Sequence, residues 1–385
     1  EVARLVLDSN YKQAQAISLA RSQVVPTMIE YRRFINVMES SGRLSRVLEA
    51  LPEDEQLAER ASTGQGLTRP ELAVLVSYAK ADLKERLVAA PVLDDPLLAG
   101  TLQRAFPRQL VEGHAEALGR HKLRREIIAT QLANDLVNHM GITFLRRMEQ
   151  STGANVGQIV AAYVLAREVF HIAEAFEAIE QLDNQLPAEL QLELMHELVR
   201  LARGATRWFL RRRGPELEPS IEAEHFAPRI RALNAGFDGM LEGSVRELWQ
   251  ERFDYFIQAG VPAPIARQAA GTVHLYTLLG VIRAADATGE PEEKVAKVLF
   301  TLGSELQLPW LGEQVNSLPA TSQWQALARE AYRDELESQL SALTISVLHN
   351  GQAEASASEL VSTWLEDNRT PMQRWQRLVA ELRAA

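Results

Sequence analysis

The chain has 385 residues, of which 46% are hydrophobic and 24% are charged, and its formal net charge is -10. This composition is typical of a globular protein with two or three domains, and it excludes a largely disordered, collagen-like or low-complexity chain. Because the sequence has no cysteine, disulfides, thiol nucleophiles and cysteine-based metal sites are excluded as well. The acidic balance argues against a nucleic-acid partner and suits a cytoplasmic protein.

The chain begins with Glu1 rather than Met, and its first residues lack the basic and apolar regions of a signal peptide. We therefore expect a piece of a longer polypeptide, although processing would leave the same start. The longest apolar run covers residues 159–166. A membrane span needs about 20 such residues, so no membrane partner is expected.

Capping residues mark several helix starts along the chain. Thr68 is followed by Glu71 three residues later, with proline between them, which is the pattern of a capping box. Asp95 and Thr370 each place a capping oxygen before a proline. Helix ends are indicated by glycines that follow or divide apolar runs. These glycines are Gly141, Gly153, Gly260, Gly289 and Gly351.

Apolar residues recur every three or four positions over three long stretches, 159–182, 190–208 and 324–347. This spacing places them on one face of a helix. We find no strand-length alternation of apolar and polar residues bounded by turn residues. The sequence therefore predicts an all-α fold of about a dozen helices in two packed helical bundles, with no significant sheet.

Two short stretches interrupt the helical pattern and resemble linkers. Residues 62–66 are small and polar, and residues 214–219 contain two prolines. They divide the chain into a helical lead segment at 1–66, a helical bundle at 67–214 and a C-terminal helical bundle at 215–385.

Nucleotide-binding motifs are absent from the sequence. The nearest match is Gly64-Gln65-Gly66, which has neither a third glycine nor a preceding strand, and we interpret it as a flexible loop. We expect no catalytic and no cofactor-binding residue in this segment.

The spacing Glu-x-x-His occurs three times and would allow two ligands on one helix face to bind a metal. The pairs are Glu168 with His171, Glu193 with His196, and Glu222 with His225. The first two pairs are too close in sequence for an intervening helix that would supply further ligands. We therefore interpret the pairs as helix-surface contacts and expect no metal, although a di-iron carboxylate site stays as a weaker alternative.

Arginine carries most of the positive charge and is concentrated near residue 207. Helical spacing places four arginines on one face beside a tryptophan, and such a face suits a protein contact. Ion pairing between packed helices is the competing interpretation. The predicted contact surface consists of Arg200, Arg203, Arg207, Trp208 and Arg211.

Five segments, in their order and spacing, resemble the C-terminal region of the large bacterial NAD-specific glutamate dehydrogenases. They are 8–19 (DSNYKQAQAISL), 67–75 (LTRPELAVL), 124–134 (RREIIATQLAN), 162–170 (AYVLAREVF) and 179–184 (IEQLDN). The chain departs from the family pattern at 105–107 and 140–144, which indicates a divergent branch.

The resemblance implies a parent enzyme that oxidises L-glutamate to 2-oxoglutarate and ammonia and passes hydride to NAD. The present segment would then be a structural or regulatory tail without a cofactor of its own, while NAD binds elsewhere in the parent. Its expected partners are the catalytic core of the same polypeptide and further copies in a homo-oligomer. A stand-alone helical protein-interaction module without enzymatic activity is the alternative.

Overall fold

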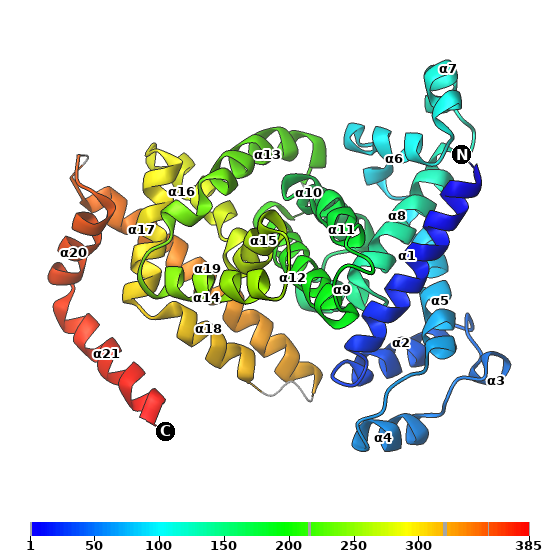
Figure 1. The fold of residues 1–385 in the computed structure, drawn as a ribbon, viewed down its shortest axis with the longest axis horizontal. Coiled ribbons are helices and arrows are strands. Elements are labelled where there is room, and N and C mark those ends of the chain that lie inside the picture. Colours follow the sequence, from blue (N-terminus) through cyan, green and yellow to red (C-terminus); the bar gives the residue numbers. More distant parts are fainter. Residues whose placement is uncertain (1, 215–216, 319–321, 353, 385) are drawn as a thin grey trace. The chain divides into compact units, whose positions relative to one another are not determined.

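The computed structural model describes residues 2–214, 217–318, 322–352 and 354–384 (Figure 1). Every regular element in these residues is a helix, and no strand is present among them. The prediction of an all-α fold is confirmed. The expected number of helices was too low, because the described residues form 21 α-helices.

The chain forms two compact units, Glu1–Glu224 and His225–Ala385, and the division falls within helix α13 (Pro219–Ala235). Residues 1–66 pack in the same unit as residues 67–214. The first unit contains α1 Val2–Ser22, α2 Met28–Ser40, α3 Arg46–Glu49, α4 Asp54–Ser62, α5 Arg69–Leu87, η1 Pro91–Asp94, η2 Pro96–Leu98, α6 Ala99–Arg104, α7 Arg108–Gly119, α8 Arg124–Met140, α9 Phe144–Thr152, α10 Val156–Val169, α11 Ile172–Glu180 and α12 Ala188–Arg213.

Helix α10 forms the centre of the first unit. Every side chain from 159 to 166 is buried, as expected for a helix that is apolar all round. It packs against α12, α11, α9 and α5. Helices α1, α5 and α8 lie side by side at the periphery of the same unit (Figure 1).

Most predicted helix ends are confirmed. Thr68 and Glu71 form the expected capping box at the start of α5. Asp95 accepts a hydrogen bond of 2.8 Å from the backbone N–H of Leu97 and so caps η2. Gly153 ends α9, and its left-handed φ of 71° is a conformation that glycine adopts without strain.

Two helix predictions were wrong. The apolar face from 159 to 182 belongs to two helices, because the backbone of His171 has a left-handed φ of 50° and separates α10 from α11. Thr370 was expected to precede a helix, whereas α21 begins at Arg369, directly after Asn368, so Thr370 lies inside its first turn.

The stretch 62–66 begins with the last residue of α4 and is hydrogen-bonded to that helix. The backbone N–H of Thr63 donates to carbonyls in the last turn of α4, and its hydroxyl donates to the carbonyl of Arg60 at 3.0 Å. A Cβ on Gly66 would overlap the side chain of Val24. Glycine at 66 therefore allows the backbone to pack directly against the turn between α1 and α2.

The second unit is organised around α17, which packs against α14, α16, α18, α19 and α20. The indole N–H of Trp375 donates a hydrogen bond of 3.1 Å to the carbonyl of Leu306 and ties α21 to this unit.

No helix in the described parts of the chain has both the length and the hydrophobicity to cross a bilayer. The elements of this unit are η4 Phe237–Met240, α14 Gly243–Gln258, α15 Ala263–Leu275, α16 Leu278–Thr288, α17 Glu292–Glu305, α18 Leu308–Ser317, α19 Gln323–Asn350, α20 Ala357–Asp367 and α21 Arg369–Ala384.

Candidate functional site

The predicted arginine surface lies on α12, but its five residues do not share one exposed face. Arg200 and Arg211 are exposed, and Arg203 is half-buried. Arg207 and Trp208 are buried at 5% and 6% exposure. Only Arg200, Arg203 and Arg211 are therefore accessible to a partner.

Packing within the first unit explains why Arg207 and Trp208 are buried. The guanidinium of Arg207 donates a hydrogen bond of 2.6 Å to Ser151 Oγ at the end of α9. The Trp208 ring meets Phe209 edge-on at 5.4 Å between centroids. A long arginine stem can line an apolar helix interface while its head group pairs inside, so helical spacing alone does not show exposure.

A polar cluster joins α8 and α10 inside the first unit. The carboxylate of Asp135 pairs with Arg167, contacts His139 Nδ1 at 2.9 Å and accepts a hydrogen bond of 3.3 Å from the Tyr163 hydroxyl. The His139 ring stacks on Phe176, with centroids 4.2 Å apart. The side chains of Arg167 and His139 are 9% and 10% exposed.

The charge state of this cluster is fixed by its neighbours. Burial disfavours the charged form of Asp135, but Arg167 and His139 outweigh that effect and hold the pKa of its carboxyl far below the ordinary value. Burial and the nearby carboxylate raise the pKa of Tyr163 well above 10. At pH 7 Asp135 is therefore charged and Tyr163 neutral, and their contacts connect α8 to α10.

Sequence reasoning missed this cluster, although a signal was present. Asp135 and His139 are four residues apart, as are Tyr163 and Arg167. Residues at that spacing share a helix face. The Glu-x-x-His spacing joins residues three apart, so it includes neither of these pairs.

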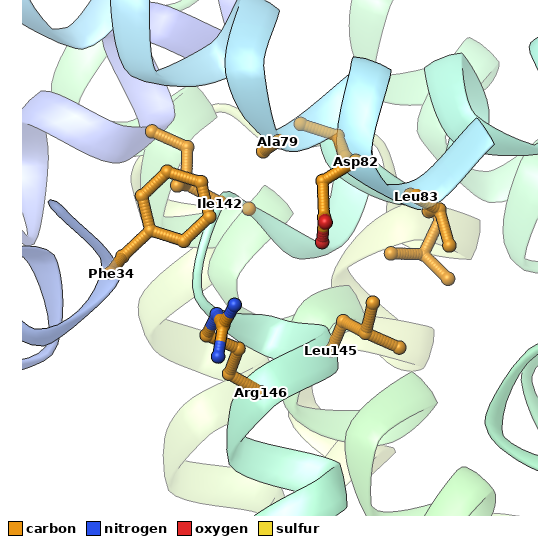
Figure 2. A pocket seen from close by; sticks show the side chains of 10 residues that line it. Phe34, Ala79, Asp82, Leu83, Ile142, Leu145 and Arg146 are labelled. Carbon is orange, nitrogen blue, oxygen red and sulfur yellow. The ribbon is translucent and has the colours of Figure 1, made fainter. Parts of the chain in front are cut away.

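A small cavity lies between α5, α8 and α9 and has a volume of about 10 Å³. Asp82 from α5 and Arg146 from α9 point toward it, together with Phe34, Ile142 and Leu145 (Figure 2). A cavity of this size holds about one water molecule. It is too small for an amino acid or a nucleotide.

The charged groups beside the cavity already serve an ion network. Asp82 pairs with Arg43 and, at 3.3 Å, with Arg86, which also pairs with Glu149. The Arg146 guanidinium lies 5.9 Å from the centroid of the Phe34 ring. This arrangement connects the α2–α3 turn, α5 and α9, and we interpret it as structural.

The three Glu-x-x-His pairs do not come together. No group of three or more His, Asp or Glu side chains within the described ranges could hold a metal ion. His171 occupies the left-handed position before α11, and Glu222 pairs with Arg213 at 3.0 Å. His225 lies 3.0 Å from Asp286.

His196 forms a close contact with a hydroxyl, since its Nε2 lies 2.8 Å from Ser22 Oγ. The hydroxyl of Ser22 also lies 2.8 Å from the carbonyl of Leu19, where it donates its proton. His196 Nε2–H then acts as the donor to Ser22. Burial and the cations Arg200 and Arg203 lower the pKa of His196 to about 4. The pair connects the end of α1 to α12.

We expect His274 to make the stability of the second unit dependent on pH. Its ring meets Phe300 edge-on at 6.3 Å, and burial together with Arg252 lowers its pKa from 6.5 to about 4. The folded protein then binds this proton less readily than the unfolded chain does. The contribution is therefore complete above pH 6.5 and is lost as the pH falls toward 4.

Between pH 7 and pH 5 we expect this residue to lower the free energy of unfolding by about 2 kcal/mol. His274→Leu removes that part of the pH dependence. Urea unfolding followed by tryptophan fluorescence suits the measurement, because five of the six tryptophans lie in the second unit. His349→Gln, at an exposed position of α19, is the matched control. Parallel pH profiles for the wild type and His274→Leu would contradict the expectation.

Comparison with known proteins adds the family relationship. A family model described as "Glutamate dehydrogenase, C-terminal" matches residues 64–385. The NAD-specific glutamate dehydrogenase of Pseudomonas aeruginosa is 50% identical over 384 residues, which make up 100% of this chain and 24% of that protein. Those of Halomonas elongata and Mycobacterium tuberculosis are 42% and 31% identical and cover 99% and 100% of this chain. The chain spans 24% of the length of each of these relatives.

Proposed function

The chain belongs to the glutamate dehydrogenase C-terminal family, and we propose that it is the helical, non-catalytic region of a long NAD-dependent glutamate dehydrogenase. The whole protein oxidises L-glutamate to 2-oxoglutarate and ammonia and passes hydride to NAD. The observation that carries the proposal is the match to a C-terminal family model by a chain that spans 24% of relatives named for this activity. The resemblance predicted from the sequence is thereby confirmed.

The fold supports a division of labour within that protein. A dinucleotide site of the βαβ type needs parallel strands and a glycine-rich turn, whereas the described part of this chain is helical throughout. Its charged clusters around Asp135 and Asp82 are internal helix-to-helix pairs. We therefore assign hydride transfer to the rest of the polypeptide and assign a bracing role to this region.

In this proposal the region contacts the catalytic core of its own chain and neighbouring subunits of a cytoplasmic homo-oligomer. Long charged side chains at the surface of α12 suit such contacts. Those accessible to a partner are Arg200, Arg203 and Arg211.

The first test is the intact mass of the polypeptide in its source cell. We expect a mass far above the 43.0 kDa of this chain. A mass near 43.0 kDa would overturn the proposal and favour a stand-alone helical protein-interaction module.

The second test is activity. We expect the isolated 385-residue chain to form no NADH from glutamate and NAD, whereas the full-length polypeptide does so. Deletion of this region from the full-length polypeptide is expected to lower its turnover or change its oligomer size. Full-length protein that keeps both its kinetics and its oligomer size after the deletion would contradict a bracing role.

A further inference from the structure

Two apolar side chains on the short helix α3 lie almost fully in solvent. Val47 and Leu48 are each 85% exposed, although the residues on either side of this turn, Leu44 and Leu51, are buried. Figure 1 shows α3 at the outer edge of the helices of the first unit. We call Val47 and Leu48 the α3 knob.

The backbone beneath the α3 knob is held by Arg46, whose residue exposure is only 4%. Its guanidinium donates to Glu39 at 2.7 Å, to Asp54 at 2.7 Å and to the carbonyl of Pro52 at 2.8 Å. It also bonds to the side-chain oxygen of Asn36. One buried side chain therefore connects α3 to both α2 and α4.

The far end of the turn is held as well. Tyr78 on α5 donates a hydrogen bond of 2.7 Å to the Glu49 carboxylate. Ala50 ends the helix in a left-handed conformation with a φ of 51°, which costs free energy for a residue with a Cβ atom. A turn fixed on three helices cannot fold Val47 and Leu48 inward, so these side chains stay displayed to solvent.

Exposed apolar side chains are concentrated in the part of the chain that carries this knob. Among the described residues, seven of the 17 exposed large apolar side chains lie within positions 1–63. These 63 positions precede the match to the C-terminal family model, which begins at residue 64. They are nevertheless part of the region shared with the Pseudomonas aeruginosa relative, of which this chain spans only 24%. The remainder of such a polypeptide is long enough to cover the knob.

We propose that the α3 knob docks into an apolar pocket on the part of the same polypeptide that precedes residue 1. This inference rests on the proposed function, because it needs a longer chain. Burial of two branched aliphatic side chains supplies the attraction. The Arg46 and Tyr78 anchors hold the knob in its docked shape before contact, which lowers the entropic cost of docking.

Cysteine labelling in the full-length protein tests the proposal, because this chain has no cysteine of its own. Leu48→Cys and Val47→Cys are introduced separately, and Trp324→Cys, at a position that is 80% exposed on α19, is the matched control. Maleimide modification is then followed at each site by peptide mass spectrometry. We expect the two α3 sites to react at least about tenfold more slowly than position 324 in the native protein. All three sites are expected to react at equal rates in denaturant.

Each other outcome overturns a distinct part of the argument. Native labelling at 47 and 48 as fast as at 324 would show that nothing covers the knob. Slow labelling that becomes fast when the protein is diluted to monomers would assign the cover to a second copy of the chain. An intact mass near 43.0 kDa would overturn the proposed function itself, whereas fast labelling in a much longer chain would overturn only the docking inference.

Discussion

Replacing Asp135 by alanine is expected to destabilise the first unit by about 3–5 kcal/mol, the range found when one partner of a buried ion pair is removed. The substitution leaves Arg167, whose side chain is 9% exposed, without its carboxylate. It also removes the acceptor of the Tyr163 hydroxyl and the contact of His139 Nδ1. Hydrogen exchange of the α8 and α10 amides measures the loss locally, and chemical unfolding measures it globally.

A matched control separates burial from charge. Glu112→Ala removes the partner of Arg108 in an exposed pair on α7, with side chains 59% and 83% exposed. We expect a change within about 0.5 kcal/mol there. The double variant Asp135→Leu with Arg167→Leu is expected to recover part of the loss, because no buried charge is then left alone. An Asp135→Ala protein as stable as Glu112→Ala would show that the buried ion pair of Asp135 with Arg167 does not stabilise the first unit.

The contribution of Asp135 to the free energy of unfolding is expected to depend on pH. The folded-state pKa of Asp135 is lowered, so its contribution is present above the unfolded value of about 3.9 and is lost as the pH falls toward the folded value. The difference in unfolding free energy between the wild type and Asp135→Ala is therefore expected to shrink below about pH 4 and to stay constant above about pH 5.

The sequence was a good guide wherever one residue imposes a local backbone state. Thr68 with Glu71 predicted the start of α5, and Gly153 predicted the end of α9, because caps and left-handed glycines act within one turn. The break between α10 and α11 was missed. It occurs at His171, whose left-handed conformation is not marked by glycine or proline.

The candidate site was less predictable because it depends on which helix faces meet. Helical spacing placed Arg207 and Arg211 on one face, yet Arg207 bonds to Ser151 on α9 and is buried. Spacing could have found the polar cluster within each helix, from Asp135 to His139 for example. The pairing of Asp135 with Arg167 joins positions 32 residues apart, and only tertiary packing brings them together.

The second large effect is expected at Gly243, the first residue of α14. Its φ is +51°, and an added Cβ would overlap the hydroxyl of Ser304 on α17. That hydroxyl also accepts a hydrogen bond of 2.9 Å from the backbone N–H of Ser244. Gly243→Ala therefore combines left-handed strain with overpacking, and we expect it to destabilise the second unit by about 2–4 kcal/mol.

A double-mutant cycle divides this cost into its two causes. Ser304→Gly in the Gly243→Ala background relieves the overlap but not the backbone strain, so about 1–2 kcal/mol is expected to remain after correction for Ser304→Gly alone. Gly312→Ala in α18, where a Cβ meets nothing within 4 Å, is the control and is expected to be neutral or stabilising by up to about 1 kcal/mol. Urea unfolding followed by tryptophan fluorescence measures all four variants. If Gly243→Ala and Gly312→Ala are equally stable, neither the strain nor the close approach of α14 to α17 exists in the folded protein.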